Sequence, residues 1–174
     1  IQRWEFSGNE QKRAQDQAAR AYGHLFGLKT ACLRHTNAIG GANPHMSHLA
    51  QSVITAIMQG EPVTLRSDGS PAKGYLAVHD VCAAYLVLAE GLIDGRVAPA
   101  TAWNAGAEVV SALDLAQRLA AIAGVEAKIV VGATSPESGY WQALDSTRLR
   151  ALGWRPRPFT DALAETWAWY AERG

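Results

Sequence analysis

Four consecutive polar residues, Arg34 to Asn37, follow a predicted strand over residues 28–33. Polar side chains at the end of a strand are candidates for ligand binding, because connecting segments carry most binding residues. Asn37 is the strongest candidate of the four. A loop asparagine can equally serve only to stabilise its own turn, so both interpretations stay open.

Two histidine patterns could in principle do other chemistry. His45 and His48 are three residues apart, but no cysteine or carboxylate stands near them, so we predict no metal site. His79 and Asp80 lie at the junction of a strand and a helix. They indicate a helix start rather than a catalytic dyad.

The elements that must position these residues are clearest between Lys73 and Leu92. Residues 75–78 are typical of a short buried strand, whereas apolar residues recur at helical spacing from Val81 onward. Asp80 is predicted to cap this helix and to suit the positive end of its dipole. A strand that feeds directly into a helix indicates an α/β fold.

The remaining pattern also alternates helices and strands. A capping box from Ser7 to Glu10 predicts a helix over residues 8–26, with Ala14, Ala18, Ala21, Tyr22 and Leu25 on one face. We further predict helices over residues 45–58, 111–123, 145–153 and 159–171, strands over 28–33, 62–65, 101–104 and 127–131, a turn over 68–71 and a loop over 132–139. Residues 1–174 are expected to form one unit.

Composition limits the possible function classes. The 174 residues are 48% hydrophobic, and 16 basic residues balance 16 acidic ones, so no nucleic-acid or membrane partner is indicated. Apolar runs fall far short of the roughly 20 residues of a membrane helix, and no signal peptide is predicted. The two cysteines, Cys32 and Cys82, suit a reducing compartment, and we expect a soluble, cytoplasmic protein.

A dinucleotide site needs a strand, a glycine-rich turn and a helix whose N-terminus meets the pyrophosphate. The sequence has no Gly-x-Gly-x-x-Gly or related spacing, and Gly40-Gly41 precedes a loop rather than a helix. By itself, the chain is therefore not expected to be a complete nicotinamide enzyme.

Seven segments form a recognisable series along the chain: Lys12 with its alanine-rich helix, Arg34 to Gly41, Ser67-Asp68-Gly69, Tyr75 to Val81, Trp103 to Gly106, Asp145 to Arg148, and Leu152 to Pro156. In order and spacing, they resemble the second half of the extended short-chain dehydrogenase/reductases, the NAD-dependent epimerase/dehydratase family. The Asn-x-Ile-Gly-Gly segment is most similar to that of the CDP-glucose 4,6-dehydratases within this family.

The resemblance implies roles for individual residues. Lys12 stands at the position of the family's catalytic lysine, which also holds the nicotinamide ribose, but Gly8 replaces the tyrosine four residues earlier and has no proton to give. His35 lies where the backbone approaches the nicotinamide. Asn37 and Asn104 match substrate contacts.

Lys73 matches an arginine that holds the nucleotide diphosphate, and Gly74 replaces that arginine's acidic neighbour. A lysine keeps the charge but loses the bidentate geometry of a guanidinium. Ser135 falls where some epimerases have a second diphosphate arginine. Lys12 and Lys73 could equally be ordinary surface lysines.

The implied fold is the C-terminal portion of a Rossmann-like α/β enzyme with its small substrate-binding lobe, without the N-terminal glycine-rich βαβ part. The implied function is the substrate-binding half of a CDP-glucose-like 4,6-dehydratase, with NAD as cofactor and a CDP- or UDP-hexose as substrate. Such a half would act as a homo-oligomer or with a separate N-terminal half. The alternatives are a non-catalytic sugar-nucleotide-binding or subunit protein, and a fragment of a longer enzyme.

Overall fold

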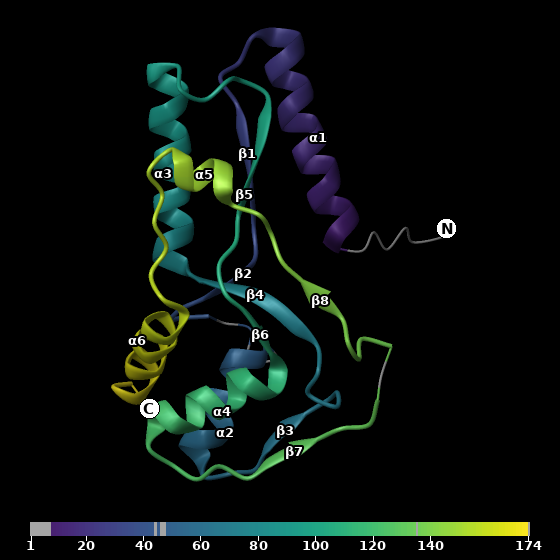
Figure 1. Ribbon diagram of the computed structural model, residues 1–174, viewed down its shortest axis with the longest axis vertical. Coiled ribbons are helices and arrows are strands. Elements are labelled where there is room, and N and C mark those ends of the chain that lie inside the picture. The colour runs from purple at the N-terminus through teal and green to yellow at the C-terminus, as the bar shows by residue number, and fades with distance from the viewer. Residues whose placement is uncertain (1–7, 44, 46–47, 135, 174) are drawn as a thin grey trace. The chain divides into compact units, whose positions relative to one another are not determined.

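The computed structural model describes residues 8–43, 45, 48–134 and 136–173, and Figure 1 shows their course. Contacts within the chain divide it into two compact units. Among the described residues, the first unit contains 8–34, 82–105 and 146–154, and the second contains 35–81, 106–145 and 155–173. The prediction that the whole chain acts as one sugar-nucleotide-binding unit stays a prediction.

The first unit is built around a pair of strands. Its elements are α1 (Gly8–Phe26), β1 (Ala31–His35), most of α3 (Val78–Asp94), β5 (Thr101–Ala105) and α5 (Thr147–Ala151). Strands β1 and β5 pair with each other and lie between α1 and α3 in Figure 1. Helix α1 approaches closely at Gly23, where an added Cβ would lie 2.4 Å from Thr30 Oγ1.

An ion pair joins α1 to β1. The Arg34 guanidinium donates to both carboxylate oxygens of Asp16, with Nε at 3.0 Å and Nη2 at 2.9 Å. The hydrogen bonds from Arg34 lower the pKa of Asp16 below its ordinary value. Arg34, one of the four polar residues at the strand's end, therefore has a structural partner.

The predicted bounds of helix α1 are confirmed, and its predicted apolar stripe is left uncovered in this chain. Ala14, Ala18 and Ala21 are exposed, as are Tyr22 at 56% and Leu25 at 76%. The covered positions of this helix include Ala19 and Gly23 instead. Ser7, the predicted first residue of the capping box, lies outside the described residues.

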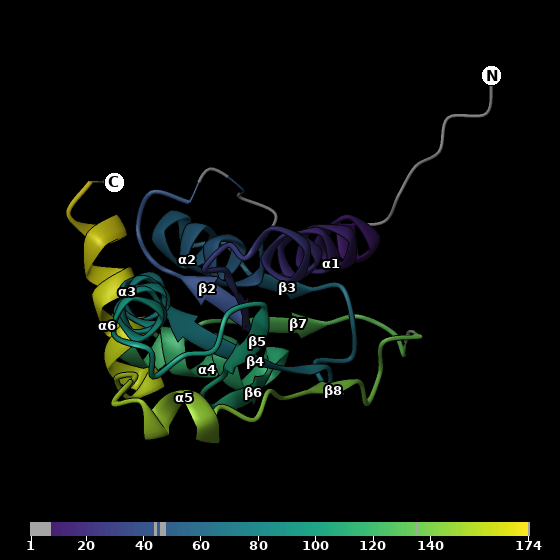
Figure 2. The same ribbon diagram turned by 90° about the horizontal axis from the view of Figure 1, so that it is seen from above.

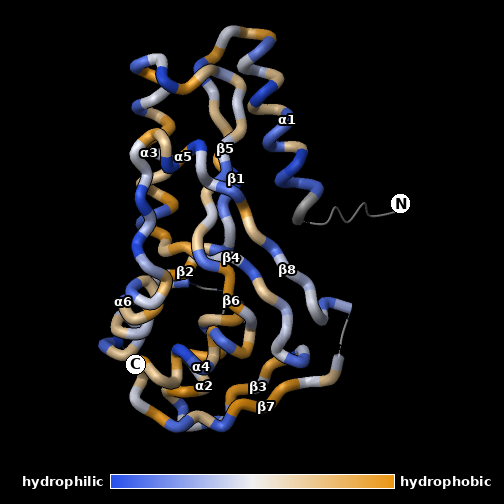
Figure 3. Tube along the Cα trace, in the orientation of Figure 1, coloured by the Kyte–Doolittle hydropathy of each residue, from blue (hydrophilic) through white to orange (hydrophobic). Residues whose placement is uncertain are grey.

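The second unit contains the longer sheet. Strand β4 (Ala72–Ala77) pairs in parallel with β2 (Asn37–Ile39) and β8 (Trp141–Gln142), and antiparallel with β6 (Val109–Ser111). A separate parallel pair joins β3 (Val63–Leu65) to β7 (Ile129–Val131). Both strands of this pair are strongly hydrophobic in Figure 3.

Three helices complete this unit: α2 (Leu49–Gln59), α4 (Ala112–Ala123) and α6 (Phe159–Ala171). Helix α4 packs against α2 and α6, an arrangement that Figure 2 shows from above. Its predicted start is confirmed, because Ser111 Oγ accepts a hydrogen bond from Asp114 N at 3.0 Å. Fully buried apolar side chains such as Leu115, Leu119 and Leu163 form the core.

The junction between β4 and α3 differs from its prediction. The strand ends at Ala77 and the helix begins at Val78, so Asp80 lies within the first turn. Its predicted place at the positive end of the helix dipole is confirmed, whereas its role as a cap stays a prediction. The buried Asp80 carboxylate also accepts hydrogen bonds from Arg157 N at 3.1 Å and Arg157 Nε at 3.3 Å.

Several other boundaries differ from the predicted ones. Strand β1 covers residues 31–35 instead of 28–33, α2 begins at Leu49, and α5 is confined to residues 147–151. Strands β2, β6 and β8, which were not predicted, contain only two or three residues each. Within the described ranges, no helix combines the length and the apolar character needed to cross a bilayer.

Candidate functional site

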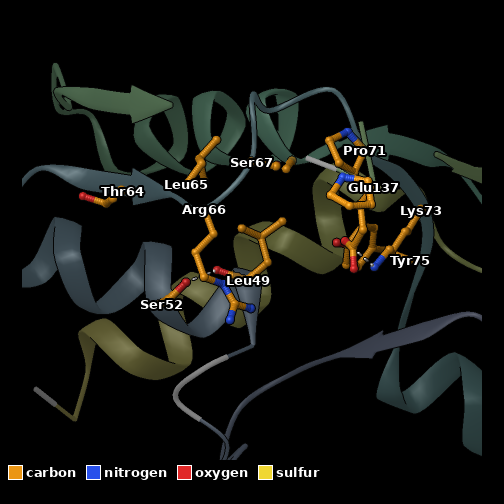
Figure 4. Close-up of a pocket in the computed structure, with 12 residues that line it drawn as sticks. Leu49, Ser52, Thr64, Leu65, Arg66, Ser67, Pro71, Lys73, Tyr75 and Glu137 are labelled. Atoms are coloured by element: carbon orange, nitrogen blue, oxygen red, sulfur yellow. Dashed lines mark hydrogen bonds and ion pairs between the residues drawn. The ribbon is translucent and has the colours of Figure 1, made fainter. Parts of the chain in front are cut away.

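A cavity of about 530 Å³ opens within the second unit (Figure 4). This volume is in the range of small-molecule sites. Helix α2, the segment that follows β3, strand β4 and the loop around Glu137 provide its walls. The polar side chains among its lining residues are Ser52, Thr64, Arg66, Ser67, Lys73, Tyr75 and Glu137.

Strand β4 places Lys73 and Tyr75 in this cavity. The two residues are two positions apart in a strand, so their side chains lie on the same face of the sheet. The residue between them, Gly74, lies against Thr36, where an added Cβ would be 2.6 Å from Thr36 Cγ2. Gly74, the predicted replacement for an acidic residue, thus occupies a position with no room for a side chain.

Asn37 lies in β2 and pairs in register with Tyr75. Its Nδ2 donates to the Gly74 carbonyl oxygen at 3.2 Å, which adds a side-chain bond between the two strands. The structure therefore brings Asn37 and Lys73, two predicted site residues, onto neighbouring strands. Whether Asn37 also contacts a ligand stays a prediction.

The other predicted site residues have different surroundings. Lys12 is exposed on α1, and Asn104 is half-buried in β5; both belong to the first unit. His35 is exposed, with Nδ1 2.7 Å from the Thr36 carbonyl oxygen. Ser135 lies outside the described residues. The cofactor and substrate roles of these residues stay predictions.

The cavity carries an ion pair that the sequence did not reveal. Lys73 Nζ lies 3.9 Å from Glu137 Oε2 and 5.7 Å from the centre of the Tyr140 ring. The side chains of Lys73 and Glu137 are 37% and 70% exposed, so water screens their attraction and the pair contributes at most about 1 kcal/mol to stability.

Backbone and side-chain contacts fix the loop that carries Glu137. Ala72 N donates to the Tyr140 carbonyl oxygen at 2.8 Å, and Gly139 N donates to Ser70 Oγ at 2.9 Å. Ser70 belongs to the predicted turn over residues 68–71, in which its hydroxyl and amide both donate to Asp68 Oδ1. These hydrogen bonds from Ser70 lower the pKa of Asp68.

Arg66 and Glu137 are the charged lining residues that sequence reasoning missed. Arg66 directly follows the predicted strand over residues 62–65, so the same strand-end pattern that indicated Asn37 could have found it. Glu137 has no such signal, since it reaches Lys73 from a loop far along the sequence.

Comparison with known proteins identifies similar chains. The model of the NAD dependent epimerase/dehydratase family matches residues 9–106. A dTDP-glucose 4,6-dehydratase of Streptomyces niveus is 29% identical over 164 residues, which cover 92% of this chain and 47% of that protein.

Two solved structures show the fold. The dTDP-glucose 4,6-dehydratase of Bacillus anthracis in complex with NAD superposes with a TM-score of 0.83 at 21% identity, over 97% of this chain and 53% of that one. A UDP-glucose 4-epimerase of Thermotoga maritima with UDP-glucose gives a TM-score of 0.79 at 21% identity, over 92% and 52%. The predicted α/β, Rossmann-like fold class is confirmed, and the chain spans about half the length of these relatives.

The burial of Tyr75 predicts how the free energy of unfolding depends on pH. Its ring is 7% exposed and lies 5.6 Å from the Phe159 ring, and burial raises the pKa of Tyr75 to about 12. The unfolded chain releases this proton near pH 10, so between about pH 10 and 12 the folded state binds more protons than the unfolded state. The free energy of unfolding should therefore fall as pH rises through this window, by up to about 3 kcal/mol.

Urea unfolding of the wild type and Tyr75→Phe at pH 9 and pH 11.5 measures this effect. The variant should lose less stability than the wild type over that interval, because phenylalanine has no proton to release. Equal losses in both proteins would show that Tyr75 does not titrate differently in the two states.

Proposed function

Because the chain belongs to the NAD-dependent epimerase/dehydratase family, we propose that it is the nucleotide-sugar-binding half of a sugar-nucleotide 4,6-dehydratase. We expect a CDP- or UDP-hexose as ligand, with CDP-glucose as the substrate that the Asn-x-Ile-Gly-Gly segment favours. The dTDP-glucose and UDP-glucose named for the similar proteins support a nucleotide sugar as the ligand class.

One observation carries this proposal: Lys73, the residue assigned to the diphosphate from sequence, lines a cavity of about 530 Å³. Asn37 lies on the strand next to it, within hydrogen-bond distance of the Gly74 carbonyl oxygen. In this arrangement Lys73 would meet the diphosphate and Asn37 would contact the sugar. The Ser67 hydroxyl, which accepts a hydrogen bond from Gly69 N, would donate a further hydrogen bond.

NAD is the cofactor of the family, but the residues of this chain do not form a dinucleotide site. Lys12 is exposed on α1 and could reach a ribose hydroxyl. The glycine-rich turn that would hold a pyrophosphate does not occur in the 174 residues, and Gly8 stands where the proton donor is expected. No hydride-transfer step is therefore assigned to this chain.

The replacement at Gly8 favours a second candidate, a non-catalytic sugar-nucleotide-binding or subunit protein of the same family. The DNA upstream of the codon for Ile1 discriminates between the two. An open frame that encodes a glycine-rich βαβ unit supports a fragment of the longer enzyme, whereas a stop codon supports the non-catalytic protein.

We expect the 174-residue chain alone to form no 4-keto-6-deoxy product from CDP-glucose and NAD. Glycine at position 8 cannot transfer a proton, and the chain offers no dinucleotide loop. Chromatography of the nucleotide sugar after incubation with the pure chain measures this. Product formation above that of a protein-free control would contradict the expectation.

Lys73→Ala should weaken the binding of CDP-glucose or UDP-glucose about tenfold or more. A charge-assisted contact contributes about 1.5–3 kcal/mol. Removal of the ammonium also removes the positive charge that lies 3.9 Å from the Glu137 carboxylate, which would repel the phosphates. Calorimetry measures the dissociation constants, with Lys29→Ala as the matched control, because Lys29 is exposed and belongs to the other unit. If Lys73→Ala and the control bind equally well, the diphosphate lies elsewhere.

We also propose self-association through α1, because its apolar stripe is exposed. Tyr22 and Phe26 are in ring contact at 5.2 Å, and Leu25 is 76% exposed beside them. The wild type should sediment as a dimer or larger species at micromolar concentration, and Leu25→Asp should shift it to monomer. Ile93→Asp is the control, because Ile93 on α3 is also 76% exposed. A monomeric wild type would rule out this interface.

A further inference from the structure

The two cations of the cavity differ in their electrostatic surroundings. Lys73 has Glu137 at 3.9 Å, so its charge is partly balanced. Arg66 lines the same cavity and is exposed, and within the described ranges no acidic side chain forms an ion pair with it. Arg66 is therefore the uncompensated positive charge of the cavity.

The side chains of Arg66 and Lys73 also occupy different parts of the cavity. In Figure 4 the Arg66 side chain runs towards Ser52 on α2, whereas Lys73 and Glu137 lie together near Tyr75. An anion at the guanidinium would consequently not have to displace Glu137. An anion at Lys73 would have to compete with it.

The backbone at Arg66 is held in place by its neighbours. Strand β3 ends at the buried Leu65 and pairs in register with β7, which ends at Val131. At Gly132 an added Cβ would lie 2.5 Å from the Arg66 carbonyl oxygen, and Gly132 N donates to the Ser67 carbonyl oxygen at 2.8 Å. The guanidinium is thus presented from a fixed point of the wall.

Ser67, the residue that follows Arg66 in the chain, supplies a hydroxyl group to the cavity. Ser67 Oγ lines the cavity and accepts a hydrogen bond from Gly69 N at 3.3 Å. Because the oxygen acts as the acceptor there, its own hydrogen can be donated to a ligand. In Figure 4 this hydroxyl lies apart from the Arg66 guanidinium, so the planar guanidinium by itself offers the paired donors that match two phosphate oxygens.

We propose that Arg66 is the principal anion anchor of the cavity, and that Glu137 opposes anion binding at Lys73. Arg66 binds a phosphate of the ligand's diphosphate through two parallel N–H···O contacts, an orientation that a lysine cannot impose. Glu137 releases Lys73 when the second phosphate arrives. The inference rests on the proposed nucleotide-sugar function and names specificity-determining residues of that site.

Calorimetric titration with UDP and with inorganic pyrophosphate tests the anchor. Arg66→Gln should weaken UDP binding at least tenfold, and Arg66→Lys should recover only a small part of this loss, because it restores the charge without the fork. Glu137→Gln should tighten UDP binding about threefold, because the competing charge is gone. Arg13→Gln, an exposed arginine of α1, is the matched control and should bind like the wild type. Thermal melts of all variants establish that they are folded.

The outcomes separate the inference from the proposed function. Equal UDP affinity of the wild type and folded Arg66→Gln overturns the anchor while the nucleotide-sugar function stands. Arg66-dependent binding of pyrophosphate without binding of UDP supports the anchor and overturns the nucleotide-sugar function. Binding of neither probe by the wild type overturns both. Unchanged affinity of Glu137→Gln overturns the role of Glu137 alone.

Discussion

The absence of a side chain at Gly74 is the constraint on which the second unit depends. Thr36 fills the space that a Cβ would need, which lets β2 lie in parallel beside β4 with Asn37 opposite Tyr75. The Asn37 side-chain amide then donates to the Gly74 carbonyl oxygen. Because side chains alternate along a strand, Lys73 and Tyr75 lie on the face of the sheet opposite to the one on which Gly74 meets Thr36. A larger residue at this position would have to move the backbone of one strand, since the conflict involves the first atoms of the Thr36 side chain. The sheet, the cavity and the placement of two candidate ligand contacts thus depend on one missing side chain.

The sequence predicted those parts of the fold that local pattern controls. The limits of α1 and the serine cap of α4 depend on residues within one or two helical turns, and both are confirmed. Strands β6 and β8 are two or three residues long and exist because β4 pairs with them, so nothing in their own composition marks them. Asp80 shows the same limit: its place at a strand–helix junction followed from local pattern, but the guanidinium that bonds to it from far along the chain did not. Of the candidate site, Lys73 followed from a family motif and Arg66 was available from the strand-end rule. Glu137 could not be predicted, because tertiary contacts alone determine the position of its loop.

The departures from the family pattern affect both the cofactor side and the substrate side of the proposed site. In the proposed function, Gly8 removes a proton donor from the side that would face the cofactor, whereas the lysine at position 73 would alter the contact with the diphosphate. The cavity lies entirely within one unit of the chain, so the geometry of its walls does not depend on residues of the first unit. The candidate ligand cavity and position 8 thus belong to different units of the chain. A binding function can persist in such an arrangement even where the catalytic residues have changed.

The contact between Arg157 and Asp80 joins residues 77 positions apart in the sequence. The second unit is assembled from three separated segments, and its last segment supplies Phe159 and Leu163 to the core. During synthesis on the ribosome, β4 and the start of α3 emerge long before the helix that covers them. The apolar surface of Tyr75 and its neighbours therefore stays uncovered until the last segment has been made. Bringing that segment back to β4 closes a long loop of chain, which costs conformational entropy, and only the contacts of the last segment can offset this cost. For this unit, the order in which the chain is made is not the order in which its core can be completed.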